Sequence, residues 1–217
     1  MSSVRTPGGY PGAWLVVGAA AQAGLAYLGF RHPKYFWRVL PPGLAACGAA
    51  ALPGLGGRPD RVPLAWIGLG ALTGVAGYGV TAGASALVGR FAWGRRSLAR
   101  IQEASRGCPR PIAALLAVPA AVGEELFWRE SVLGRRLPPG RAGALGTLIC
   151  PTLAYSLVQV GSCQPLPPLG ALLIGSGAGW LRLRSGSIWP AVVAHLAYTE
   201  LTLVAPGLPG APNHGQT

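Results

Sequence analysis

Three carboxylates and one guanidinium fall within seven residues of a segment that is otherwise apolar. The segment 121–134 contains Glu124, Glu125, Arg129 and Glu130 among Ala, Val, Gly, Leu, Phe and Trp. In a helix that crosses a membrane, each centrally placed charge costs about 2.5–3.5 kcal/mol on insertion scales. Ionisable groups at such a depth face the interior of the bundle or a water-filled cavity, and we therefore expect a functional site here.

Helical spacing assigns different roles to these groups. Glu125 and Arg129 stand at i and i+4 with the acid first, which is the favoured order for an ion pair. In a low dielectric such a pair mainly offsets the desolvation of its two members, so we expect it to support the site. Glu124 is rotated from Glu125 by about 100° and has no partner on its own helix. A buried carboxylate of this kind suits a general base.

A second ionisable group lies in the last apolar segment, 187–205. His195 and Thr199 stand one turn apart there and share a helix face. At 1.5 Å per residue, Glu124 lies about 15 Å and His195 about 12 Å from the same end of the bundle. Gln159 is about 18 Å from that end. We therefore predict that the three side chains meet.

Two further acids are expected at the membrane interfaces. Glu130 lies close to the end of its helix and can reach back toward Arg135 or Arg136, as long polar side chains do at interfaces. Glu200 is predicted at or near the opposite interface. Neither position requires a role in chemistry.

The elements that position these groups are predicted to be transmembrane helices. The 217-residue chain is 51% apolar and only 11% charged, about half the charged fraction of a soluble domain. Uncharged runs cover 12–30, 39–57, 62–89 and 142–181. Prolines 165, 167 and 168 divide the longest run into two, and 111–134 and 187–205 complete the set.

The sequence thus predicts an all-α, polytopic membrane bundle of about seven transmembrane helices. We expect N-terminal helices and a basic loop over 1–110, a core that carries the motifs over 111–205, and a flexible tail over 206–217. The spacings Gly70–Gly74 and Gly79–Gly83 favour close helix packing. The expected location is the plasma membrane of a bacterium.

Charge and cysteine content exclude several classes of protein. The chain has 18 basic and 6 acidic residues, a net charge of +12. The arginines of the 90–110 loop are expected to anchor the topology by contacting anionic membrane lipid. No basic platform with interleaved aromatic residues is present, so nucleic acid is not an expected partner. The four cysteines are scattered without a C-x-x-C pair, which argues against a zinc or redox motif.

The motifs together resemble one family of membrane enzymes. The segment from Glu124 to Arg129 has the E-E-x-x-x-R pattern of the CPBP family, which comprises CAAX proteases and bacteriocin-processing enzymes and is also called the ABI family. Ser187 to His195 is similar to the family's last motif, and Tyr155 to Gln159 falls where its middle motif, F-x-x-x-H, is expected. The resemblance covers roughly 111–203.

This resemblance implies an intramembrane endopeptidase without a cofactor. Glu124 would activate water, Glu125 and Arg129 would support it, and His195 would help to bind the water or stabilise the oxyanion. The substrate would be a protein or peptide, membrane-anchored in some cases. One histidine with one or two glutamates is a poor zinc shell, so no metal is expected.

Three departures from the family pattern leave alternatives open. Gln159 replaces the middle histidine, Thr199 replaces a final Asn or Asp, and Glu130 replaces the usual Gly. A glutamine can donate a hydrogen bond to an oxyanion, but it cannot take a proton. One alternative is a catalytically silent relative that acts as a membrane binding or immunity factor. Another is a transporter in which a buried Glu/His pair relays protons.

Overall fold

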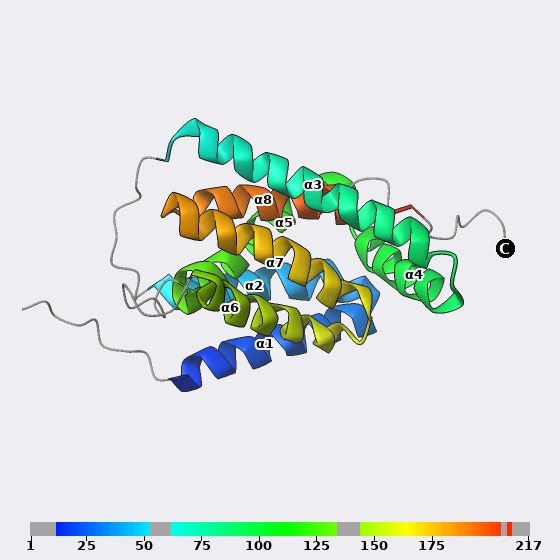
Figure 1. Ribbon diagram of the computed structural model, residues 1–217. Helices are drawn as coiled ribbons and strands as arrows, with labels where there is room; N and C mark the ends of the chain where they lie inside the picture. The colour runs from blue at the N-terminus through cyan, green and yellow to red at the C-terminus, as the bar shows by residue number, and fades with distance from the viewer. Residues whose placement is uncertain (1–11, 53–61, 134–143, 205–207, 210–217) are drawn as a thin grey trace, which may run out of the picture.

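The computed structural model describes residues 12–52, 62–133, 144–204 and 208–209, and these residues form eight α-helices and no strand. The prediction of an all-helical fold is confirmed. The long helices lie side by side in one bundle, with α4 at one end of it (Figure 1). Residues 1–11 lie outside the described residues, as does most of the tail, for which we predict flexibility.

The helices follow the uncharged runs closely. Short 3-10 segments precede α2 and follow α6, and π-helical segments extend α5 and α8. In chain order, the α-helices and their π-helical extensions are α1 Gly12–Arg31, α2 Phe36–Ala51, α3 Leu64–Val88, α4 Ala92–Arg106, α5 Arg110–Glu125 with η3 Leu126–Leu133, α6 Ala144–Val158, α7 Leu166–Ser185, and α8 Trp189–Thr199 with η6 Glu200–Val204.

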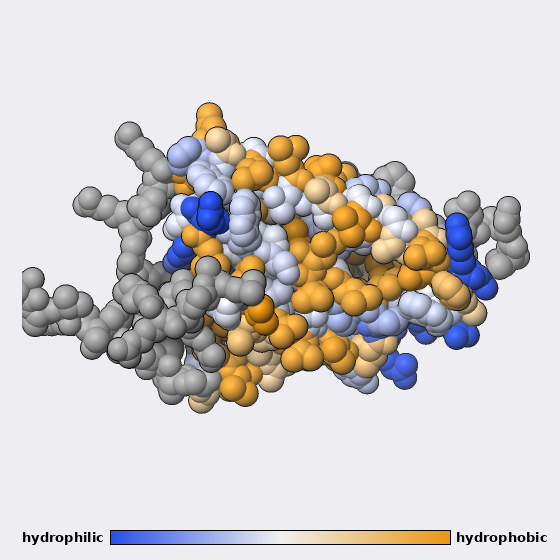
Figure 2. Space-filling view, in the orientation of Figure 1, coloured by the Kyte–Doolittle hydropathy of each residue, from blue (hydrophilic) through white to orange (hydrophobic). Residues whose placement is uncertain are grey.

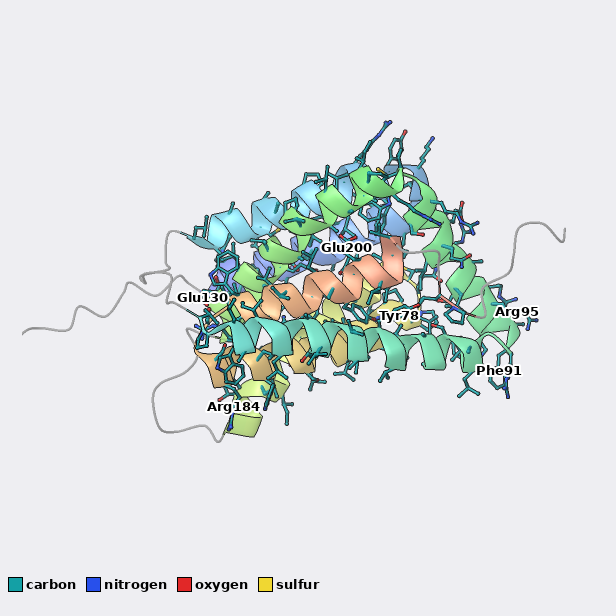
Figure 3. The ribbon with its side chains drawn as sticks, turned by 90° about the horizontal axis from the view of Figure 1, so that it is seen from above. Tyr78, Phe91, Arg95, Glu130, Arg184 and Glu200 are labelled. Atoms are coloured by element: carbon teal, nitrogen blue, oxygen red, sulfur yellow. The ribbon has the colours of Figure 1, made fainter. Side chains whose placement is uncertain are left out.

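Three of the described helices are long and apolar enough to cross a membrane: Ala13–Arg31, Leu64–Val88 and Arg110–Leu133. Their outer faces carry exposed apolar side chains; Leu64 and Leu72 on α3 are 85% and 66% exposed. Apolar side chains cover much of the face shown in Figure 2. The basic residues gather at the two ends, with Arg184 at one and Arg95 at the other (Figure 3).

Close approaches between helices depend on glycine. Gly48 on α2 and Gly123 on α5 leave no room for a Cβ atom against each other's helix, and Gly70 and Gly74 on α3 lie against the backbone of α8. The predicted packing role of Gly70 and Gly74 is therefore confirmed. The same prediction for Gly79 and Gly83 is wrong, because a Cβ atom at either position would meet nothing within 4 Å.

The basic segment 90–110 differs from the loop that we predict. Most of it forms α4, whose inner face carries the buried residues Leu98, Ile101 and Ala104. Ile101 and Ala104 pack into a core that includes Phe36 and Trp37 of α2. The four arginines of α4 lie at exposed positions, and its buried positions carry small or apolar residues. α4 is therefore an amphipathic surface helix.

The proline-rich break in the longest uncharged run lies where the sequence predicts it. The chain leaves α6 through a 3-10 turn, Gln159–Ser162, and Cys163 adopts a left-handed conformation with φ of 53°. Pro167 and Pro168 then occupy the first turn of α7, where a missing backbone N–H costs nothing. α6 and α7 pack against each other as a hairpin.

Candidate active site

Four ionisable side chains form a chain of contacts between α5 and α8. Arg129 Nε lies 3.2 Å from Glu125 Oε2, so the predicted ion pair is present. Glu125 Oε1 lies 2.8 Å from His195 Nδ1, and His195 Nε2 lies 3.3 Å from Glu124 Oε2. All four residues are at least 94% buried.

The order of these contacts fixes the chemistry of the histidine ring. The Nδ1–H group donates to Glu125, whose charge Arg129 balances, and this leaves Nε2 directed at Glu124. Two unprotonated acceptors repel each other, so this contact is favourable when Glu124 or Nε2 carries a proton. Such a pair can take up and return a proton, as general acid–base catalysis requires.

A change in helix type follows the two glutamates directly. α5 ends at Glu125, and the next eight residues, Leu126–Leu133, form a π-helix. Its wide turn allows the Ser131 hydroxyl to donate to the carbonyl of Leu126 at 3.1 Å. π-Helical segments inside longer helices occur often at functional sites. Here the segment carries Arg129 back toward Glu125.

Two side chains of the middle motif also reach Glu124. The Tyr155 hydroxyl donates to Glu124 Oε2 at 3.1 Å, and Gln159 Nε2 donates to Glu124 Oε1 over a longer 3.5 Å. The structure thus brings Glu124, Gln159 and His195 together, as the depth argument predicts. Sequence reasoning did not assign a role to the Tyr155 hydroxyl, although the residue opens the recognised motif.

The carboxylate of Glu124 lines a cavity of about 350 Å³. Gln22, Tyr155, Gln159 and His195 contribute further polar groups, and most of the remaining wall is apolar. The wall extends to the α4 end of the bundle; its members there include Val88, Ile101, Leu166 and Leu208. The cavity is therefore long enough to join the buried carboxylate to the part of the bundle that α4 covers.

The structure also gives the surroundings of two further residues that the sequence analysis names. Thr199 lines the cavity one turn beyond His195, but among the described hydrogen bonds its side chain forms none with the ring. The arginines that Glu130 is expected to reach, Arg135 and Arg136, lie outside the described residues. Among the described residues, Glu130 accepts two hydrogen bonds from Arg182 of α7, at 2.9 and 3.3 Å.

A buried amide completes the support of the site, and sequence reasoning missed it. Gln22 of α1 is 2% exposed, and its Oε1 accepts a hydrogen bond from Trp128 Nε1 at 2.8 Å. Trp128 in turn packs against Tyr155, with ring centroids 5.6 Å apart. The sequence does contain a signal for it: Gln22 carries an amide within the 19-residue uncharged run 12–30, and polar groups inside membrane helices seldom lack a partner.

Within the described ranges, no three His, Cys, Asp or Glu side chains converge as a metal ion would require. The expectation that no metal is bound stays a prediction.

Comparison with known proteins agrees with the motif analysis. Residues 108–199 match the family model described as "Type II CAAX prenyl endopeptidase Rce1-like". No curated protein and no solved structure matches the chain significantly. The matched residues run from the last residues before α5 to the end of α8. They include the side chains in contact around Glu124, here called the Glu124 cluster: Glu124, Glu125, Arg129, Tyr155, Gln159 and His195. The segment 108–199 is therefore a domain of the Rce1-like type II CAAX prenyl endopeptidase (CPBP) family, a family of polytopic membrane proteins.

Proposed function

We propose that the protein is an intramembrane endopeptidase that hydrolyses a peptide bond with water activated by Glu124. One observation carries the proposal: a buried carboxylate lines a cavity and contacts a histidine whose other ring nitrogen is bound by a charge-balanced glutamate. Paired groups of this kind, held in fixed positions away from bulk water, are typical of general acid–base catalysis.

The proposed reaction needs only water as a co-reactant. Glu124 takes a proton from a water molecule while the water oxygen bonds to the carbonyl carbon, and the π electrons move to the carbonyl oxygen. His195, oriented by Glu125, lies 3.3 Å from the Glu124 carboxylate and stabilises its negative charge before and after it holds the proton. The carbon–nitrogen bond then breaks, and the proton held by the pair passes to the leaving amine.

The surroundings of the site favour an apolar or membrane-anchored substrate. The cavity wall between Glu124 and the α4 end is mostly apolar, with Leu40, Leu44, Val80 and Leu173 among its members. An extended peptide with apolar side chains gains free energy there by leaving water. The substrate then enters from the membrane face that α4 covers, and its scissile bond reaches Glu124 along the cavity.

The same proposal gives the chain seven membrane helices. Besides the three long apolar helices, four others would lie within the membrane: α2, α6, α7 and α8. In the same bundle α2 packs along α5, α7 and α8 pack along α3, and α6 packs along α7. α4 would lie at the interface, with the exposed side chains of Phe91 and Trp93 at its start and its arginines toward anionic lipid headgroups. A bacterial plasma membrane provides such lipids.

The decisive experiment compares peptide termini in membranes and secreted fractions of cells that express the wild type or Glu124→Gln. We expect a defined set of new termini that requires Glu124. Glu103→Gln is the matched control, because Glu103 is an exposed acid on α4 that pairs with Arg100. An unchanged set of termini in the Glu124→Gln cells would count against proteolysis.

One observation favours a second candidate, a silent relative that binds but does not cleave. The position of the middle histidine holds Gln159, which reaches Glu124 only over 3.5 Å and cannot take a proton. Gln159→His tests this alternative. If neither the wild type nor Gln159→His releases Glu124-dependent termini, the binding role is favoured.

A further inference from the structure

We propose that Tyr155 is a further catalytic residue, whose hydroxyl donates a hydrogen bond to the oxyanion of the tetrahedral intermediate. The inference rests on the proposed peptidase function. It supplies a hydrogen-bond donor for the oxyanion in a site where Gln159 replaces the histidine of the middle motif. The motif analysis treats Tyr155 only as the aromatic position of F-x-x-x-H.

The hydroxyl lies where the reaction would take place. It donates to Glu124 Oε2 at 3.1 Å, on the same carboxylate oxygen that faces His195 Nε2. Tyr155 also lines the cavity, so a peptide bound against Glu124 meets this side chain. A water held by Glu124 attacks a carbonyl whose oxygen lies within a few ångströms of that carboxylate, and an oxyanion donor must reach about 2.7–3.1 Å from it.

Neighbours on two segments, η3 and α7, hold the ring that carries the hydroxyl. The Arg129 guanidinium lies 4.8 Å from the ring centroid, and the Trp128 ring lies 5.6 Å from it. On α7, a Cβ atom added at Gly175 would lie only 3.0 Å from Tyr155 Cδ1. Tyr155 is 3% exposed. The hydroxyl oxygen is therefore fixed, and only its hydrogen is free to turn.

The charge that moves during the reaction explains how one hydroxyl can serve two acceptors. In the resting site the carboxylate of Glu124 is the acceptor. When Glu124 takes the proton of water, its negative charge is lost and a new one appears on the carbonyl oxygen. The Tyr155 hydrogen then turns to the stronger acceptor, since hydrogen bonds to charged groups are about twice as strong as neutral ones. The O–H bond itself does not break.

Spacing makes Gln159 the companion donor. Residues 155 and 159 stand at i and i+4, and both side chains point at Glu124. Gln159 makes the longer contact, at 3.5 Å against 3.1 Å. The stronger donor of the pair is thus the phenol.

The experiment compares Tyr155→Phe with Tyr78→Phe on purified protein, using a peptide that spans a Glu124-dependent cleavage site. Tyr78 lies on α3 and belongs to neither the cavity wall nor the Glu124 cluster described here (Figure 3). Removing one oxyanion donor lowers kcat by about 10²–10³-fold. We expect that loss for Tyr155→Phe, with KM changed by less than about threefold because the donor acts mainly in the transition state. Tyr78→Phe should behave as wild type.

A melting curve separates this role from a structural one. Losing one buried hydrogen bond shifts the melting temperature by only about 2–4 °C, and 3,5-difluorotyrosine at position 155, which keeps the hydroxyl, should restore most of kcat. An unchanged kcat in Tyr155→Phe, or a change confined to KM, overturns the inference while Glu124-dependent cleavage still supports the peptidase. If the wild type cleaves nothing, both proposals fail together.

Discussion

Glu125 accepts a hydrogen bond from Nδ1 of His195 at 2.8 Å, so the carboxylate that balances Arg129 also orients the histidine. The contact joins two helices through residues that are 70 positions apart in the chain. Because Nδ1 is occupied, only Nε2 can face Glu124, and the position of α8 relative to α5 decides whether the pair can share a proton. The supporting ion pair is therefore part of the arrangement that prepares Glu124.

Removing the charge of Glu125 should destabilise the protein strongly. Glu125→Gln keeps an oxygen acceptor for His195 but leaves the guanidinium of Arg129 buried without its partner. An unpaired buried charge of this kind costs about 3–5 kcal/mol. Chemical denaturation in detergent micelles measures the loss.

The double variant Glu125→Gln/Arg129→Met provides the control for that prediction. Replacing both charges removes the unpaired guanidinium, so the double variant should regain most of the lost stability. A double variant no more stable than Glu125→Gln would contradict this account of the ion pair.

Replacing His195 should slow the reaction more than it affects folding. His195→Gln keeps a side chain of similar length but cannot take a proton. General acid–base groups contribute about 10²–10⁴-fold to rate, and we expect a fall in kcat of that size with peptide release as the assay. His32→Gln is the matched control, because His32 is exposed at the turn between α1 and α2. Equal activity of the two variants would exclude His195 from the chemistry.

The sequence predicts well where the helices lie and how deep each site residue is along its helix, because both follow from local patterns. Uncharged runs give the positions of the helices, the i, i+4 spacing gives the ion pair of Glu125 and Arg129, and counting residues from the ends brings Glu124 near His195. Depth along a helix depends only on the rise per residue, which is the same in every helix.

Rotation of one helix about its axis relative to another is not a local property, and contacts that depend on it do not follow from the sequence. Glu130 pairs with Arg182, a contact that the sequence does not indicate, because α7 presents that side chain to η3. The hydroxyl of Tyr155 is another case, since the sequence does not indicate which neighbour it meets. The glycine pairs on α3 have one spacing, yet only Gly70 and Gly74 face α8.

That difference within α3 gives a prediction about packing. Gly74→Ala places a methyl group against the carbonyl of Ala194, the residue before His195. Overpacking of this kind costs about 1–3 kcal/mol, and a shift of α8 would also move the histidine. Gly79→Ala, on the same helix, meets open space and should leave both properties unchanged. Thermal unfolding and peptide cleavage report the two effects, and equal behaviour of the variants would contradict the packing scheme.

The ion pair between Glu130 and Arg182 should stabilise the π-helical segment that carries Arg129. Both side chains are partly buried, with exposed fractions of 26% and 19%, and Arg182 donates to both carboxylate oxygens. We expect Glu130→Gln to lower the free energy of unfolding by about 1 kcal/mol, because the remaining solvent exposure limits the pair. The exchanged variant Glu130→Arg/Arg182→Glu should recover part of that loss, since the opposite charges again face each other. Denaturation curves of the wild type and the three variants test this, and an exchanged variant less stable than both Glu130→Gln and Arg182→Glu would show that the charges do not interact.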